Sequence, residues 1–146
     1  MTDELRTFLK NPRSLQIRLK SNALDLKLLE DTVKPQAIVY DRDKVQSSPS
    51  DPMLRYIERY EELLIQREAL VNAYLESCKA VARAADSLPG VQSMIIKFRF
   101  LYGMQSDEIA EEINYSTRQY YRLYTKAVAA LDGYMKKKSE CAGGET

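Results

Sequence analysis

Apolar residues recur at alternating steps of three and four through much of the first 89 positions, as in helices that pack along their whole length. Between Pro12 and Val33 this pattern has one gap, which the polar residue Asn22 fills. The apolar positions of the stretch are Leu15, Leu19, Leu26, Leu29 and Val33. We therefore predict a helix over 12–33 with Asn22 buried in its packing seam.

A second and longer pattern of the same kind runs from Met53 to Ala85. Asp51 followed by Pro52 suits a helix start, and the Pro89-Gly90 pair suits a helix end. Such a helix, on the order of 50 Å long at 1.5 Å per residue, cannot bury its apolar stripe alone. We expect it to form an antiparallel helical hairpin with the first helix, a coiled-coil arm that also dimerises. The stripe consists of Met53, Ile57, Tyr60, Leu64, Arg67, Val71, Tyr74, Cys78, Val81 and Ala85.

The segment between the two patterns, 34–51, is rich in Ser, Asp and Pro and has no helical period, which predicts an extended connection. Its apolar residues suggest that it packs along the helices. These residues are Ile38, Val39, Tyr40 and Val45.

Downstream of Gly90 the pattern predicts three shorter helices, over 91–102, 107–114 and 117–137. The gaps between them are short, so the last two helices should meet at a corner of the helix-turn-helix kind.

The residues in these gaps are suited to ending one helix and starting the next. Gly103 is a C-cap residue, and Ser106 is expected to cap the helix that opens with Asp107. Ser116 and Gln119 match a capping box, in which each side chain satisfies a backbone N–H near the other residue. The predicted fold is therefore all-α, with an arm over 1–89, a three-helix domain with a helix-turn-helix over 90–138 and a flexible tail over 139–146.

Composition narrows the chemistry that this chain can perform. It contains no histidine, which removes the commonest general base and the commonest zinc ligand. Its two cysteines, Cys78 and Cys141, form no CxxC pair. We expect a protein that is not an enzyme and that needs no metal and no cofactor.

Hydropathy indicates the cellular location of the protein, and the distribution of charge indicates the kind of partner it binds. The N-terminal stretch lacks the apolar block of a signal peptide, and no stretch is apolar enough to span a membrane, so we expect a cytoplasmic protein without a membrane partner. The net charge is only +1, but residues 116–138 carry six basic side chains against Asp132 alone. This concentration of positive charge is what a phosphate-binding surface requires.

The predicted last helix separates into an apolar side and a polar, basic side. Arginine and glutamine near the start of such a helix can read guanine and adenine in the major groove. The residues expected to bind DNA are Thr117, Arg118, Gln119, Tyr121, Arg122, Thr125 and Lys126. Further phosphate contacts are expected from Ser106, Lys136, Lys137 and Lys138. A three-helix bundle whose charged face is simply solvated is the alternative on spacing alone.

Residues 94–131 resemble region 4 of sigma-70-type factors, with an arginine-bearing helix, a glycine, an EIA helix and a serine-capped recognition helix. The residues on that pattern are Ser116, Tyr120, Leu123, Ala127 and Leu131. The whole chain, with YDRDKVQSSPSD before a long helix, also resembles small phage and prophage proteins of Gram-positive bacteria related to ArpU- and RinA-type late transcriptional regulators.

The resemblance implies binding to double-stranded, promoter-like DNA and regulation of phage or prophage genes. The regulator is expected to be a homodimer formed through the apolar stripe of the arm, with RNA polymerase as a further candidate partner. This chain has no equivalent of region 2, which opens promoter DNA in a complete sigma factor, so a regulator is expected. Two alternatives stay open. One is a DNA-packaging protein of the small-terminase kind, and the other is a module that docks on polymerase or on a sigma factor without binding DNA.

Overall fold

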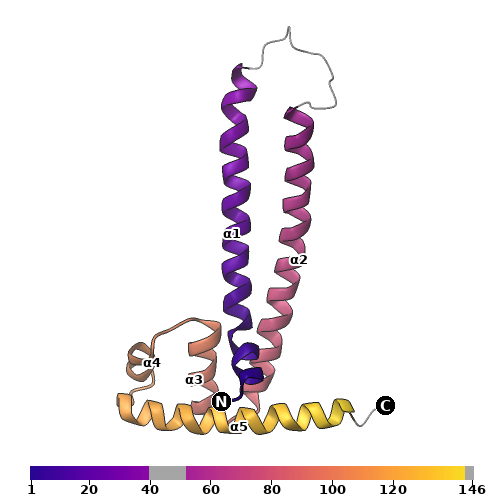
Figure 1. Cartoon of the computed structure of the whole chain (residues 1–146). Helices are drawn as coiled ribbons and strands as arrows, with labels where there is room; N and C mark the ends of the chain where they lie inside the picture. The colour runs from indigo at the N-terminus through magenta and orange to yellow at the C-terminus, as the bar shows by residue number, and fades with distance from the viewer. Residues whose placement is uncertain (40–51, 144–146) are drawn as a thin grey trace. The chain divides into compact units, whose positions relative to one another are not determined.

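The computed structural model describes the backbone of residues 1–39 and 52–143, and the side chains of 1–32 and 52–141. Every regular element in these ranges is a helix, which confirms the all-α prediction (Figure 1). The elements are α1 (Asp3–Val39), α2 (Pro52–Asp86), α3 (Gly90–Ile96), the π-helix η2 (Lys97–Leu101), α4 (Ser106–Glu112) and α5 (Thr117–Gly143). Within the described part of the chain, none of these helices combines the length and the apolar character that crossing a membrane requires.

Three helix boundaries differ from the expectations. Helix α1 begins at Asp3 rather than at Pro12, and Pro12 lies buried inside it. It also continues to Val39, so the expected extended connection over 34–51 is wrong for its first six residues. The rest of that connection, 40–51, and the side chains of 33–39 lie outside the described residues. Helix α5 runs to Gly143, so the expected tail over 139–146 begins as helix.

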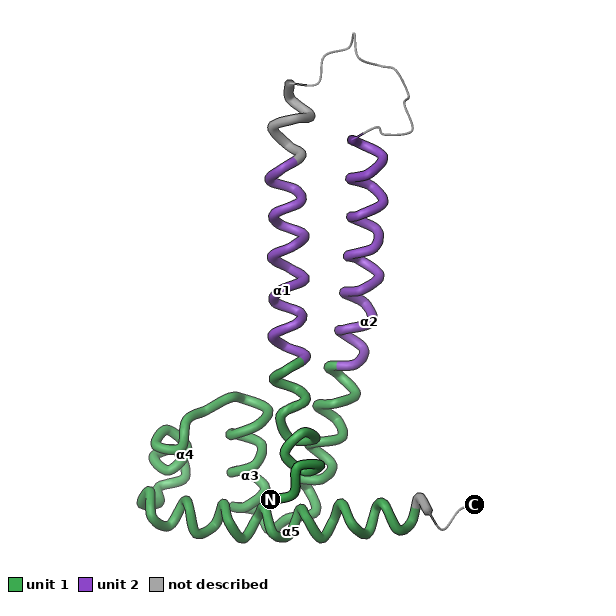
Figure 2. The backbone as a smooth tube through the Cα atoms, viewed as in Figure 1, with its two compact units in different colours: residues 1–14, 74–146 green, residues 15–73 purple. Residues whose placement is uncertain are grey.

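The described chain falls into two compact units (Figure 2). Unit 2 comprises residues 15–73, and unit 1 comprises residues 1–14 together with 74–146. The division expected at residue 89 is therefore not where the compact units divide, because both ends of the predicted arm belong to the unit that contains α3, α4 and α5.

Unit 2 is a pair of antiparallel helical segments from α1 and α2 (Figure 2). The side chain of Asn22 is 3% exposed, as the sequence predicts. Its Nδ2 atom donates to the carbonyl oxygen of Leu63 at 3.0 Å and to Oε1 of Gln66 at 3.4 Å. Its Oδ1 atom is also buried and has no partner among the described residues.

The apolar stripe expected on α2 is confirmed at its C-terminal members Val81 and Ala85, which are buried with Leu5 and Leu9 of α1, but within unit 2 it is not the surface that contacts α1 most closely. Leu63 is 1% exposed, whereas Ile57 and Leu64 of the expected stripe remain 44% and 42% exposed. Consecutive residues of a helix point about 100° apart, so the contact is rotated by one residue from the expected seam. The apolar face of α2 is broader than the surface that α1 covers.

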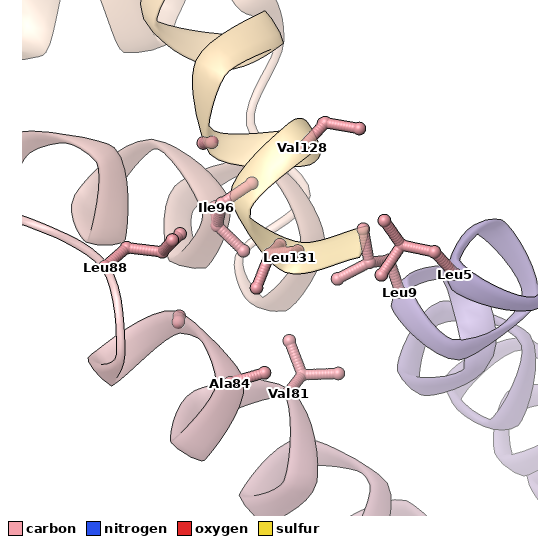
Figure 3. Packing of buried hydrophobic residues seen from close by; sticks show 10 residues of the cluster. Leu5, Leu9, Val81, Ala84, Leu88, Ile96, Val128 and Leu131 are labelled. Carbon is pink, nitrogen blue, oxygen red and sulfur yellow. The ribbon is translucent and has the colours of Figure 1, made fainter. Parts of the chain in front are cut away.

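Unit 1 is built around a cluster that joins both ends of the chain (Figure 3). Leu5 and Leu9 from the start of α1 pack with residues of α2, α3 and α5, and both are at most 1% exposed. Burial of these leucines offsets the backbone N–H that Pro12 removes from α1, which explains why the helix begins before the proline. The other members are Val81, Ala84, Ala85, Leu88, Ile96, Ala127, Val128 and Leu131.

A second cluster in unit 1 connects α3, α4 and α5. Its buried members are Ile95, Ile109, Ala110 and Tyr120. The apolar side expected for the last helix is confirmed, because Tyr120, Ala127 and Leu131 are buried in the clusters while its polar residues are exposed. Small Ala110 allows the backbone of α4 to come close to α5.

Replacing Leu9 with Ala should lower the free energy of unfolding by about 2 to 5 kcal/mol, because it leaves a cavity in the cluster of unit 1. The adjacent exposed residue provides a control, since Lys10→Ala should change stability by less than about 0.5 kcal/mol. Urea denaturation followed by circular dichroism measures both. Equal stability of the two variants would contradict the packing of the first helical turns described above.

Candidate nucleic-acid interface

The turn between α4 and α5 is fixed by backbone hydrogen bonds. Asn114 adopts φ 60°, a left-handed conformation that asparagine tolerates better than most residues. Its N–H donates to the carbonyl of Glu111 at 3.1 Å, and the N–H of Tyr115 donates to the carbonyl of Ala110 at 2.9 Å. These two bonds form a Schellman motif, which ends α4 and reverses the chain direction within a few residues.

The start of α5 is fixed by the predicted capping box. The backbone N–H of Gln119 donates to Oγ of Ser116 at 3.2 Å, and the backbone N–H of Ser116 donates to Oε1 of Gln119 at 3.1 Å. Two backbone donors that the helix leaves unpaired are thereby satisfied. This confirms the capping box and also occupies the carbonyl oxygen of Gln119, which leaves its Nε2 donors for any ligand.

The start of α4 differs from the prediction. The helix begins at Ser106, and the preceding Gln105 has extended backbone angles, φ −77° and ψ 158°, so Ser106 is not the N-cap residue. Instead, Oε2 of Glu108 accepts from the backbone N–H of Gln105 at 3.2 Å. The hydroxyl of Ser106 accepts from Nη1 of Arg99 at 3.4 Å, an interaction that ties the π-helix to α4.

All side chains expected to contact DNA on α5 are exposed: Thr117, Arg118, Gln119, Tyr121, Arg122, Thr125 and Lys126. Three cations among them follow one another at four-residue steps and so lie along one side of the helix. We call Arg118, Arg122 and Lys126 the basic row. None of the three forms a hydrogen bond or ion pair with another residue that the structure describes.

The neighbouring hydroxyls contribute less to this surface than expected. Oγ1 of Thr125 donates to the carbonyl oxygen of Tyr121 at 2.9 Å, so this hydroxyl already serves its own helix. Tyr121 itself is 51% exposed.

Aromatic rings pack against one another beside the basic row. Tyr120 is 1% exposed, and its ring centroid lies 5.1 Å from that of Tyr121 and 6.0 Å from that of Tyr124. Tyr124 also stacks on Phe100 of η2, with 6.5 Å between the centroids. Through these contacts Tyr124 packs, partly buried, against both apolar clusters of unit 1. Of Tyr120, Tyr121 and Tyr124, Tyr121 is the exposed one.

The three C-terminal lysines lie apart from the basic row. Lys136, Lys137 and Lys138 are exposed, but Lys137 is about 28 Å along α5 from Arg118 at 1.5 Å per residue. Lys136 also lines a shallow pocket together with Glu4, Asp132 and Glu140.

Asp132, one of the two acidic residues of α5, forms hydrogen bonds with the first residues of the chain. Its Oδ1 atom accepts from the hydroxyl of Thr2 at 3.1 Å and from the backbone N–H of Thr2 at 3.4 Å. Among the expected cations, Arg118, Arg122 and Lys126 lie together on one side of α5, whereas the three C-terminal lysines lie farther along the helix.

Arg99 is a positioning residue that the sequence patterns did not reveal. Its Nη1 atom donates to Oγ of Ser106, and its positive charge opposes the rise in the pKa of Tyr124 that burial causes. The apolar spacing of 91–102 predicts an α-helix throughout, whereas residues 97–101 form a π-helix, in which the N–H of Tyr102 donates to the carbonyl of Lys97 at 3.2 Å. Periodicity alone does not distinguish one π turn from an α turn.

Comparison of the chain with family models, with curated proteins and with solved structures gives no match.

Replacing Ser116 with Ala should lower the free energy of unfolding by about 1 kcal/mol, because the N–H of Gln119 loses its acceptor. Ser116→Asp is the matched control, since aspartate accepts the same bond and interacts well with a helix N-terminus. Thermal unfolding of the variants measures the effect. A Ser116→Ala protein as stable as the aspartate variant would show that this cap does not stabilise α5.

The pKa of Tyr124 should make stability fall in alkaline solution. Burial raises its pKa above the usual value, with smaller opposing effects of Arg99 and Arg6 and a further increase from Tyr120. The folded state therefore holds the phenol proton more tightly than the unfolded state. Its contribution is present below pH about 10 and is lost as the pH rises through the raised pKa.

Tyr124→Phe removes this titration. The variant should lose less stability than the wild type between pH about 9 and pH about 11, which urea midpoints measure. Equal losses in the two proteins would contradict the assigned shift.

Proposed function

We propose that the chain is a sequence-specific DNA-binding transcriptional regulator in which α4 and α5 act as a helix-turn-helix and the first turns of α5 enter the major groove. The observation that carries the proposal is the basic row, Arg118, Arg122 and Lys126, exposed on a helix whose opposite side is buried. A row on a helix anchored in this way is held at a fixed angle, which reading of base edges requires.

The dimensions of α5 suit this role. An α-helix with its side chains is about 10 to 12 Å wide, and the major groove of B-DNA is about 12 Å wide. Arg118 and Arg122 are assigned to base edges, where arginine pairs with guanine through two hydrogen bonds. Thr117, Tyr121 and Lys126 are assigned to flanking phosphates, together with the free amide donors of Gln119.

Ser106 and the C-terminal lysines receive different roles in this proposal. The Oγ atom of Ser106 accepts from Nη1 of Arg99, and its O–H remains available to donate to a phosphate near the start of α4. Lys136, Lys137 and Lys138 lie too far from Arg118 to enter the same stretch of groove. They are assigned to the sequence-independent part of the affinity, through phosphates farther along the duplex.

The resemblance to region 4 of sigma-70-type factors and to small phage regulators supports phage or prophage genes as the target, in the cytoplasm where bacterial DNA lies. RNA polymerase is assigned as a further partner, and the apolar stripe of the arm supports a homodimer as the working form. In this proposal the chain carries one reading helix, and a second copy supplies the other half of a two-fold site.

A second candidate function is docking on polymerase without DNA contact. The observation that favours it is the acidic surface of α4, whose side chains would repel phosphates if they faced the duplex. These exposed residues are Asp107, Glu108, Glu111 and Glu112.

Replacing Arg118 and Arg122 together with Ala should weaken binding to a selected DNA site by roughly 1 to 3 kcal/mol for each lost base contact. Binding to random DNA should fall much less. The site is first selected from phage-genomic fragments, and affinity is then measured by gel shift at several salt concentrations.

The matched control replaces Lys136, Lys137 and Lys138 with Ala, which should weaken binding to all sequences equally and reduce the salt dependence. Circular dichroism of each variant verifies the fold. Wild-type affinity in the double arginine variant would refute the assigned reading face. A wild-type protein that selects no fragments would favour docking on polymerase.

A further inference from the structure

The side chain of Gln119 is oriented by the cap at the start of α5, and this orientation decides what it can offer to a base. Its Oε1 atom accepts from the backbone N–H of Ser116 at 3.1 Å and from the hydroxyl of Ser116 at 3.2 Å. An amide oxygen has two lone pairs, so both acceptor positions of Gln119 are occupied. Because a backbone N–H can only donate, the amide atom that faces it must be the oxygen, and the Nε2 group is directed away from the cap.

This arrangement prevents Gln119 from reading adenine. Adenine presents an acceptor, N7, and a donor, the N6 amino group, to the major groove, and glutamine pairs with both through one donor and one acceptor. In Gln119 only the two N–H donors remain for a ligand. Turning the amide toward adenine would break both bonds from Ser116 and leave a backbone N–H at the start of α5 without its acceptor.

The two arginines of the basic row likewise offer donors and no acceptors. A guanidinium group carries five N–H donors and accepts no hydrogen bond. Both arginines are exposed, and neither bonds to another residue that the structure describes.

Side chains that could accept from a base are scarce at the start of α5. Carboxylates read the amino group of cytosine, but residues 117–131 contain no Asp or Glu. The other polar side chains of 117–123 are Thr117 and Tyr121, whose hydroxyls accept as well as donate and therefore favour no particular base edge. The first two turns of α5 thus present a surface in which donors predominate.

A surface of this kind fits guanine. The major-groove edge of guanine carries two acceptors, N7 and O6, which one arginine meets with two hydrogen bonds. Adenine and cytosine place an amino group on the same edge, so a facing arginine would have donors opposite a donor and would lose hydrogen bonds that it makes with water.

The spacing of the two arginines sets the spacing of the bases that they reach. Arg118 and Arg122 are four residues apart, which is about 6 Å along the helix. Neighbouring base pairs are about 3.4 Å apart along the duplex. Two arginines on a helix that follows the groove therefore reach base pairs separated by about two steps.

We propose that the DNA site contains two G·C pairs about two steps apart, read by Arg118 and Arg122, and that Gln119 serves the cap and a phosphate and reads no adenine. The inference rests on the proposed function, since α5 must enter the major groove, and it names the class of sequence that α5 selects.

The first test removes one acceptor from each guanine in turn. A site selected by the wild-type protein from phage-genomic fragments is synthesised with 7-deazaguanine, in which a C–H group replaces N7 and base pairing is retained. At each assigned guanine this change should weaken binding about fivefold or more, because one bond of a bidentate contact is lost. As the matched control, 7-deazaadenine at each adenine of the same site should change the affinity by less than about twofold, since no side chain reads adenine through N7.

Single arginine variants assign the two contacts. Arg118→Ala should be insensitive to 7-deazaguanine at one of the two positions and keep the wild-type sensitivity at the other. Arg122→Ala should show the reverse pattern. A variant that keeps both sensitivities would contradict the pairing of one arginine with one guanine.

The variant Gln119→Glu tests the role of the amide. Glutamate accepts from the backbone N–H of Ser116 as glutamine does, so the cap and the fold are retained, which circular dichroism verifies. The variant should bind all sequences more weakly, because a carboxylate replaces donors near a phosphate. Repeated selection with this variant should return the same guanines and no change of preference at other positions.

Three results would overturn the proposal: selected sites without two guanines at this spacing, tolerance of 7-deazaguanine at both positions, or a loss of affinity with 7-deazaadenine that Gln119→Glu abolishes. In each of these results the wild-type protein still selects a DNA site, so the proposed function stands. A wild-type protein that selects no fragments would overturn both.

Discussion

Burial of one side of α5 is the constraint on which the rest of unit 1 depends. Tyr120 anchors the start of this helix in the cluster shared with α3 and α4, and Leu131 anchors its middle in the cluster shared with the ends of α1 and α2. A helix held at two points along its length cannot rotate about its axis. The polar side, with Arg118 and Arg122, is therefore directed outward as a consequence of packing and not of its own charge.

Local backbone chemistry complements this packing at the corner before α5. The left-handed Asn114 ends one helix, and Ser116 begins the next two residues later. Each motif satisfies donors or acceptors that a helix end leaves open, so the corner is stable with very few residues. These bonds also limit the groups that remain for a ligand, because the carbonyl oxygen of Gln119 accepts a hydrogen bond in the cap and the hydroxyl of Thr125 donates one within its own helix.

In unit 2, by contrast, α1 and α2 carry more apolar surface than they bury against each other. Leu63 fills the contact with α1, and its neighbour Leu64 remains accessible. The one polar residue buried in that contact, Asn22, retains an acceptor without a partner, which costs stability but disfavours other registers of the two helices. An excess of apolar surface and a fixed register are both expected of a helix pair that assembles further.

The sequence by itself determined the central parts of the helices, the cap formed by Ser116 and Gln119, and the separation of α5 into a buried and an exposed side, because periodicity and capping are local properties. It did not determine that Leu5 and Leu9 complete the core of unit 1, or that Leu63 rather than Leu64 faces α1. Those outcomes depend on which apolar surfaces are buried against one another. That is decided only when segments distant in the sequence pack together.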